Sequence, residues 1–95
     1  MKILDRIKSR EPCVESGWDA FDFLVDAPID EAFILSLRPL GSFSYMKALK
    51  RPFFKIESHH YIIKGLQGDS FFRVAVHRDH MDELQMITGY ITGQT

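Results

Sequence analysis

Residues 60–77 have the sequence HYIIKGLQGDSFFRVAVH, and this stretch decides the fold. Two apolar-rich runs flank Gly68-Asp69, a dipeptide favoured in the two-residue turn of a β-hairpin. With these two residues at the centre of the turn, one face of the hairpin is almost wholly apolar and is expected to face the core: Tyr61, Ile63, Gly65, Phe72, Val74 and Val76. A shift of the pairing by one residue would destroy this match, which supports the register.

The opposite face of the predicted hairpin is cationic. Lys64 lies directly across from Arg73 in this register, and His60 lies across from His77. Like charges that face each other across two strands destabilise a sheet, so this face suits a bound phosphate, carboxylate or acidic protein partner. The sequence therefore predicts an anion- or partner-binding surface at Lys64, Arg73, His60 and His77. The alternative is that acidic residues from elsewhere in the chain pair with the two strong cations.

The histidines indicate a second kind of site. Across the hairpin, His60 and His77 would have Cβ atoms about 4.5–5.5 Å apart, and His80 follows one helical turn beyond His77. Converging imidazoles bind divalent transition metals such as zinc, nickel or copper, and a carboxylate such as Glu57 or Asp79 could complete the set. The sequence thus offers a metal site at His60, His77 and His80, with ordinary surface histidines as the alternative.

The remaining segments predict a single α+β domain over residues 1–95. In this domain, helices pack on one face of an antiparallel sheet of about four strands. Ile3, Leu4 and Ile7 are spaced three and four residues apart, which predicts a short amphipathic helix over residues 1–10.

The sheet is expected within residues 20–77. Besides the hairpin, residues 20–26 alternate apolar and polar side chains, and residues 53–57 are rich in strand-forming types. Residues 28–38 fit a helix that begins at a proline, although alternating apolar residues also fit a strand; more signals favour the helix. Residues 42–50 fit either structure, and the sequence does not decide between them.

The end of the chain predicts a C-terminal helix over residues 79–92. Asp79 is a favoured N-cap residue, and Gly93 suits the C-terminal end. Gly89 lies inside this helix. Either a glycine is needed there for a close approach of the helix to the sheet, or the helix tolerates its destabilising effect. The expected buried stripe consists of Met81, Leu84, Ile87 and Ile91.

Composition limits the class of protein. The chain has 95 residues, 45% of them hydrophobic, and a single cysteine, Cys13, which excludes an internal disulfide. No uncharged run approaches the roughly 20 residues of a membrane span, so a cytoplasmic protein without membrane contact is expected. Charge is uneven: residues 1–37 carry eight Asp/Glu against four Lys/Arg, whereas residues 38–78 carry two against eight.

Several functional classes lack their usual signals. There is no glycine-rich phosphate loop, no nucleophile elbow and no His-Glu-x-x-His motif, which disfavours an enzyme without excluding one. Residues 45–55 interleave basic and aromatic side chains, a pattern that can bind single-stranded nucleic acid. The pI of about 6.4, however, disfavours a protein dedicated to nucleic-acid binding. The sequence favours a small non-catalytic binding or regulatory domain that recognises an anionic ligand or acidic partner through hairpin 60–77, and that could form a homodimer. The alternative is a metal-binding protein or metal-dependent enzyme.

Overall fold

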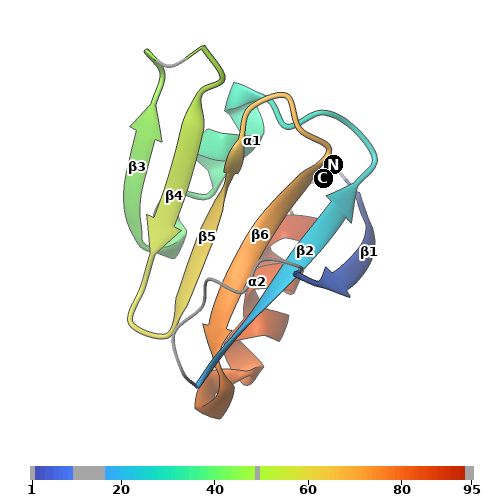
Figure 1. Ribbon diagram of the computed structural model, residues 1–95, viewed down its shortest axis with the longest axis vertical. Coiled ribbons are helices and arrows are strands. Elements are labelled where there is room, and N and C mark those ends of the chain that lie inside the picture. The colour runs from blue at the N-terminus through green and yellow to red at the C-terminus, as the bar shows by residue number, and fades with distance from the viewer. Residues whose placement is uncertain (1, 10–16, 49, 94–95) are drawn as a thin grey trace.

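The computed structural model describes residues 2–9, 17–48 and 50–93. Within these residues, six strands form one antiparallel sheet in the order β1-β2-β6-β5-β4-β3 (Figure 1). The strands are β1 (Ile3–Lys8), β2 (Trp18–Val25), β3 (Ser42–Met46), β4 (Phe53–Glu57), β5 (Tyr61–Leu66) and β6 (Phe71–His77). The helices are α1 (Glu31–Ser36) and α2 (Asp82–Thr92), each next to a short 3-10 turn, η1 (Arg38–Leu40) or η2 (Arg78–His80).

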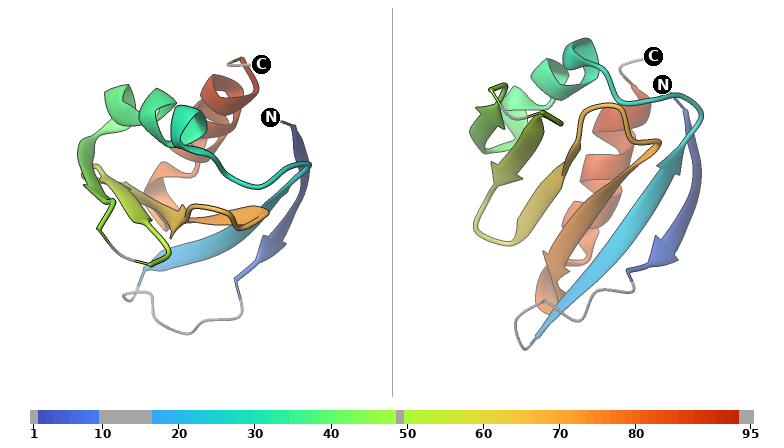
Figure 2. Two further views of the ribbon diagram at one scale, coloured as in Figure 1. Left: turned by 90° about the horizontal axis from the view of Figure 1, so that it is seen from above. Right: turned by 45° about the horizontal axis from the view of Figure 1, so that its top comes forward.

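Both helices lie on the same side of the curved sheet (Figure 2). The mixed α+β class with an antiparallel sheet is therefore confirmed, but the expected number of about four strands is wrong, because the sheet has six in the described residues. None of the helices in the described residues is long and apolar enough to cross a lipid bilayer.

The two additional strands come from segments that lacked a clear strand pattern. The helix expected over residues 1–10 is wrong, because Ile3–Lys8 form β1 and pair antiparallel with β2. Leu4 and Ile7 are exposed, so their spacing does not mark a buried helical stripe. The strand conformation of Ile3–Lys8 comes instead from backbone hydrogen bonding to the edge of β2. The undecided segment 42–50 contains β3, which pairs with β4 at the other edge of the sheet.

The central hairpin has the predicted register. Lys64 pairs with Arg73 and Tyr61 pairs with Val76 in the β5–β6 ladder. Gly68 adopts φ +95°, a conformation that favours glycine, at the turn between the strands. The amide of Gly68 donates a 2.8 Å hydrogen bond to the carbonyl of Ile29, so the turn also fixes the segment that leads into α1.

The favoured helix within residues 28–38 is confirmed, although it is shorter than expected. Asp30 is its N-cap, with Oδ1 accepting a 2.8 Å hydrogen bond from the amide of Phe33. The α-helix ends at Ser36, and η1 with Pro39 follows. A proline cannot donate the backbone hydrogen bond that would continue the helix.

The C-terminal helix is confirmed, but its predicted start is wrong. Asp79 lies in η2 and is not the N-cap of α2, which begins at Asp82. The imidazole of His77 caps η2 instead, with Nδ1 accepting from the amide of Asp79 at 3.1 Å. Three of the four expected stripe residues are buried, namely Leu84, Ile87 and Ile91, whereas Met81 is exposed.

The core lies between the concave side of the sheet and the two helices. At its centre, the rings of Phe23 and Phe72 stack with centroids 5.3 Å apart, and Phe33 of α1 approaches Phe72 at 5.6 Å. Because successive side chains of a strand point to opposite faces, the residues next to these core residues lie on the outer face of the sheet. That outer face is not covered by either helix (Figure 2).

Two glycines are expected to respond in opposite directions to replacement by alanine. A Cβ at Gly65 would lie 2.9 Å from Cζ of the buried Phe54 ring, so Gly65→Ala should lower the free energy of unfolding by about 1–3 kcal/mol. A Cβ at Gly89 would meet no atom within 4 Å, so Gly89→Ala should raise it by about 1 kcal/mol. Urea denaturation of both variants measures these changes. An unchanged midpoint for Gly65→Ala would contradict the tight packing of β5 on Phe54.

Candidate functional site

The register of the sheet aligns three cations in a row across its outer face. Lys55 of β4 pairs with Lys64 of β5, and Lys64 pairs with Arg73 of β6. Asp22 of β2 follows at the end of this row, opposite Arg73. We call Lys55, Lys64 and Arg73 the cation row. The sequence identified Lys64 and Arg73, but Lys55 joins them only because β4 lies beside β5.

Arg73 is compensated by the acidic N-terminal part of the chain. Its Nε lies 2.7 Å from Oδ1 of Asp22, and its Nη2 lies 3.4 Å from Oδ2. The two side chains are only 15% and 14% exposed, so this two-point contact is shielded from solvent. The sequence left open that acidic residues from elsewhere in the chain pair with the cations, and for Arg73 this is what the structure shows.

Lys64 has a different environment. Among the described residues, it has no ion-pair partner, although it lies between two cations. Lys55 has a weak contact with Glu57, whose Oε1 lies 3.8 Å from its Nζ. The charge of Lys64 is thus the uncompensated one at the centre of the cation row.

A pocket of about 290 Å³ opens beside Lys64 and Arg73, toward the turn of the hairpin. Its apolar lining comes from Phe53, Leu66 and Phe71, which occupy the row of the outer face next to the cation row. Asp69 also lines it, but Arg51 forms an ion pair with that carboxylate. The pocket therefore combines an apolar surface with two cationic side chains, near the lower size limit of small-molecule sites.

The predicted surface residues His60 and His77 do not line this pocket. They are neighbours, as expected, because the amide of His77 donates a 2.9 Å hydrogen bond to the carbonyl of His60. They lie at the opposite end of the hairpin from the turn. The structure thus separates the predicted anion surface into a cationic pocket and a histidine group.

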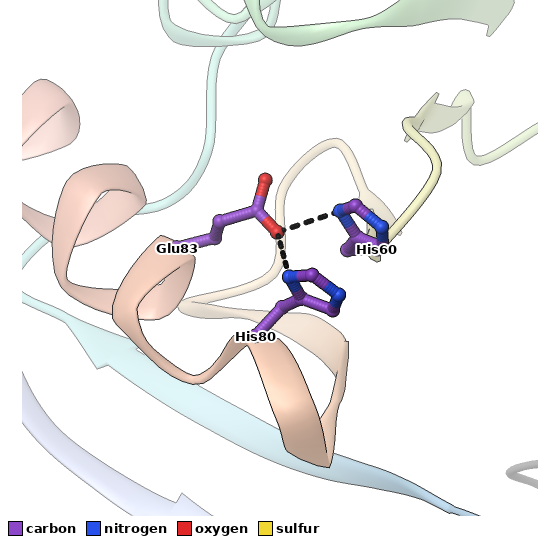
Figure 3. Close-up of side chains that lie close together, drawn as sticks. All are labelled: His60, His80 and Glu83. Carbon is purple, nitrogen blue, oxygen red and sulfur yellow. Dashed lines mark ion pairs between the residues drawn. The ribbon is translucent and has the colours of Figure 1, made fainter.

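Within the histidine group, His60 and His80 converge on Glu83 (Figure 3). The two rings stack with centroids 3.5 Å apart and planes at 11°. Oε2 of Glu83 lies 2.9 Å from Nδ1 of His60 and 3.6 Å from Nδ1 of His80. Neither Glu57 nor Asp79, the carboxylates considered from sequence, takes this position; Glu83 was missed, although it lies three residues after His80 in the first turn of α2.

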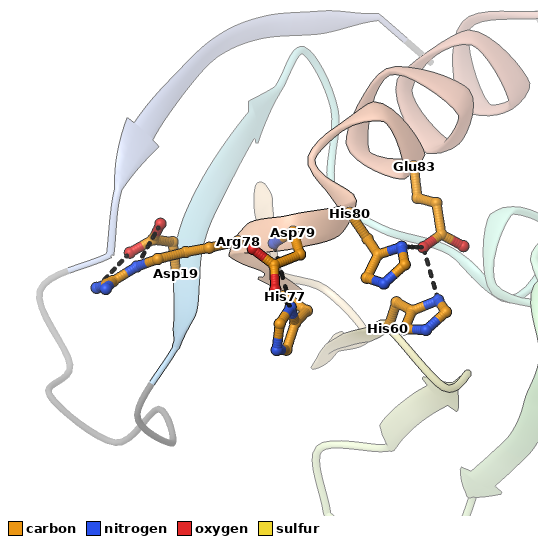
Figure 4. Close-up of polar contacts among 7 residues, drawn as sticks. All are labelled: Asp19, His60, His77, Arg78, Asp79, His80 and Glu83. Atoms are coloured by element: carbon orange, nitrogen blue, oxygen red, sulfur yellow. Dashed lines mark hydrogen bonds and ion pairs between the residues drawn. The ribbon is translucent and has the colours of Figure 1, made fainter.

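His77 lies beside this pair but is engaged elsewhere (Figure 4). Its ring meets that of His80 edge-on at 5.7 Å and that of Trp18 at 5.8 Å. Its Nδ1 accepts the hydrogen bond from the amide of Asp79. One ring nitrogen of His77 is therefore already used in capping η2.

Tyr61, the first residue of β5, follows His60 directly. Burial raises the pKa of the Tyr61 phenol above its usual value, because a phenolate would be poorly solvated there. Its hydroxyl donates to the carbonyl of Leu40. Tyr61 therefore stays neutral and structural, linking β5 to η1.

Comparison with protein-family models, with curated proteins and with solved structures found no match to this chain.

Proposed function

We propose that the protein is a small non-catalytic binding domain that recognises an anion with an apolar portion. The anionic group would contact Lys64 and Arg73, and the apolar portion would occupy the adjacent pocket. The observation that carries this proposal is the uncompensated Lys64 between two further cations. An aromatic or alkyl carboxylate or phosphate has the required chemistry, as does an acidic side chain of a protein partner beside an apolar one.

Electrostatics support an anionic ligand. Cations directly opposite each other in a sheet repel, so the cation row destabilises the unliganded domain. An anion beside Lys64 would relieve this repulsion and gain charge-assisted hydrogen bonds worth about 1.5–3 kcal/mol.

The pocket favours a ligand with an apolar portion over a simple inorganic ion. Phe53, Leu66 and Phe71 line it and are each partly exposed, so a ligand would remove apolar surface from water. A ligand small enough for about 290 Å³ has few atoms. At about 0.3 kcal/mol per non-hydrogen atom, a ligand of about ten such atoms gains about 3 kcal/mol, so we expect dissociation constants in the millimolar range.

The test is titration with phenyl phosphate, followed by NMR of the backbone amides. We expect saturable shifts centred on Lys64, Gly65 and Phe71, and weaker binding of inorganic phosphate. Lys64→Glu should weaken phenyl phosphate binding at least about tenfold. The same substitution should leave stability unchanged or higher by about 0.5 kcal/mol, because the introduced carboxylate would face two cations.

A matched control is Lys8→Glu, which makes the same charge change on β1. Two strands separate β1 from β5, so this variant should bind as the wild type does. An equal loss of phenyl phosphate affinity in both variants would mean that the effect comes from the net charge of the protein and not from Lys64. If phenyl phosphate causes no saturable shifts at these residues, the proposal fails.

A further inference from the structure

We propose that His60, His80 and Glu83 form a binding site for a divalent transition-metal ion, with Zn²⁺ as the preferred ion. This site is distinct from the cationic pocket and does not depend on the proposed function. His60 lies in the turn between β4 and β5, His80 in η2, and Glu83 in the first turn of α2 (Figure 3). Two segments thus meet at a common point: the β4–β5 turn supplies one ligand, and the consecutive η2 and α2 supply the other two.

The donor atoms already have separations close to those of a metal site. One nitrogen from each imidazole and one oxygen of Glu83 all lie within 4.8 Å of one another. The two nitrogen–oxygen distances are 2.9 and 3.6 Å. Tetrahedral zinc with bonds of about 2.0–2.2 Å separates its ligand atoms by roughly 3.4 Å. The two nitrogen–oxygen distances therefore lie close to those of a bound ion, and rotation of the imidazole rings about their side-chain bonds would complete the site.

The carboxylate of Glu83 provides an independent argument. Among the described residues, its buried Oε2 accepts no aligned hydrogen bond, and its close polar contacts are the ion pairs with Nδ1 of His60 and Nδ1 of His80. Buried polar atoms are normally satisfied, and each exception requires an explanation. A divalent cation at this point would bond to Oε2 and to a nitrogen of each imidazole, and its binding would rotate the two stacked rings out of parallel so that each ring plane contains the ion.

The donor set favours zinc over the alkaline-earth ions. Imidazole nitrogen is a good ligand for Zn²⁺, Cu²⁺ and Ni²⁺, whereas Ca²⁺ and Mg²⁺ prefer oxygen. Three protein ligands leave a fourth position, and the ligands are all partly exposed, so a water molecule or an external group would occupy it. The bound ion would also tie the β4–β5 turn to the start of α2.

His77 is not included in this set. Its Nδ1 accepts the hydrogen bond from the amide of Asp79, and its ring lies edge-on to His80 (Figure 4). The proposed site therefore differs from the set expected from sequence, with Glu83 in place of His77. The two donor sets can be distinguished by experiment, because only the proposed set predicts that Zn²⁺ binding depends on Glu83 and not on His77.

The experiment is calorimetric titration of the untagged, EDTA-treated full chain with ZnCl₂, together with the absorption spectrum of the Co²⁺ form. We expect one ion per chain, a Tm that rises with Zn²⁺ concentration, and intense visible Co²⁺ bands typical of four-coordination. Glu83→Gln and His80→Asn should each weaken Zn²⁺ binding at least tenfold. Glu83→Gln keeps the size of the side chain, so circular dichroism should show an intact fold.

Two variants serve as controls. His59→Asn removes a histidine that neighbours His60 but is not in the donor set, and His77→Asn removes the capping residue; both should retain stoichiometric Zn²⁺ binding. Absence of a one-to-one complex in the wild type would overturn the proposal. So would a folded Glu83→Gln variant that binds as tightly as the wild type, or a loss of binding in His59→Asn equal to that in His80→Asn.

Discussion

Replacing Phe72 with alanine is expected to lower the free energy of unfolding by about 3–5 kcal/mol. The Phe72 side chain is completely buried, and its ring contacts Phe23 of β2 and Phe33 of α1. Its removal would leave a cavity where the sheet meets the first helix. Domains of this size are stable by about 5–15 kcal/mol, so the variant would lose a large part of its stability.

The adjacent Phe71 provides the control for this prediction. It lies on the outer face, lines the pocket and is only partly buried, so Phe71→Ala should cost about 1 kcal/mol or less. Urea denaturation measures both variants. Equal losses would mean that the two faces of β6 are not as different as the register requires.

Replacing Asp22 with alanine is expected to lower the free energy of unfolding by about 2–3 kcal/mol. The substitution removes the carboxylate that compensates Arg73, in a contact that is only 14–15% exposed. The expected loss is below the value of about 3–5 kcal/mol for a fully buried pair, because some solvent reaches this one. Repulsion within the cation row would also increase.

This second prediction has a control and a further readout. Asp19→Ala breaks the contact of Asp19 with Arg78, whose side chain is 63% exposed, and should cost at most about 1 kcal/mol. If the proposed function is right, Asp22→Ala should bind phenyl phosphate more tightly than the wild type, because the site loses a negative charge. Denaturation and titration of the same samples test both effects, and equal stability of the two variants would contradict the first.

The parts of the fold that follow from local pattern could be predicted from the sequence. The β5–β6 register follows from alternating side chains and a glycine in the turn, and it placed Lys64 opposite Arg73. The segment over Ile3–Lys8 could not be assigned in this way. Its apolar spacing fits a helix, and its strand conformation comes from pairing with β2, which lies outside any local window.

The candidate sites depend on contacts between elements, and these were predicted only in part. Lys55 joins the cation row because β4 pairs with β5, and Asp22 reaches Arg73 because β2 pairs with β6. Neither of these two strand pairings is marked in the sequence by a recognisable hairpin turn. Glu83 was missed for a similar reason, since its approach to His60 depends on how α2 packs across the end of the sheet.

The strand order has a consequence for how the chain folds. Strands β3 to β6 are consecutive in sequence and neighbours in the sheet, so each pairing closes a short loop. The seam between β2 and β6 is different, because Asp22 and Arg73 are 51 residues apart in the chain. Contacts between distant residues slow folding, since more chain entropy is lost before they form. We therefore expect the β3–β6 part to assemble as a local unit, and the docking of β1 and β2 onto β6 to limit the rate of folding.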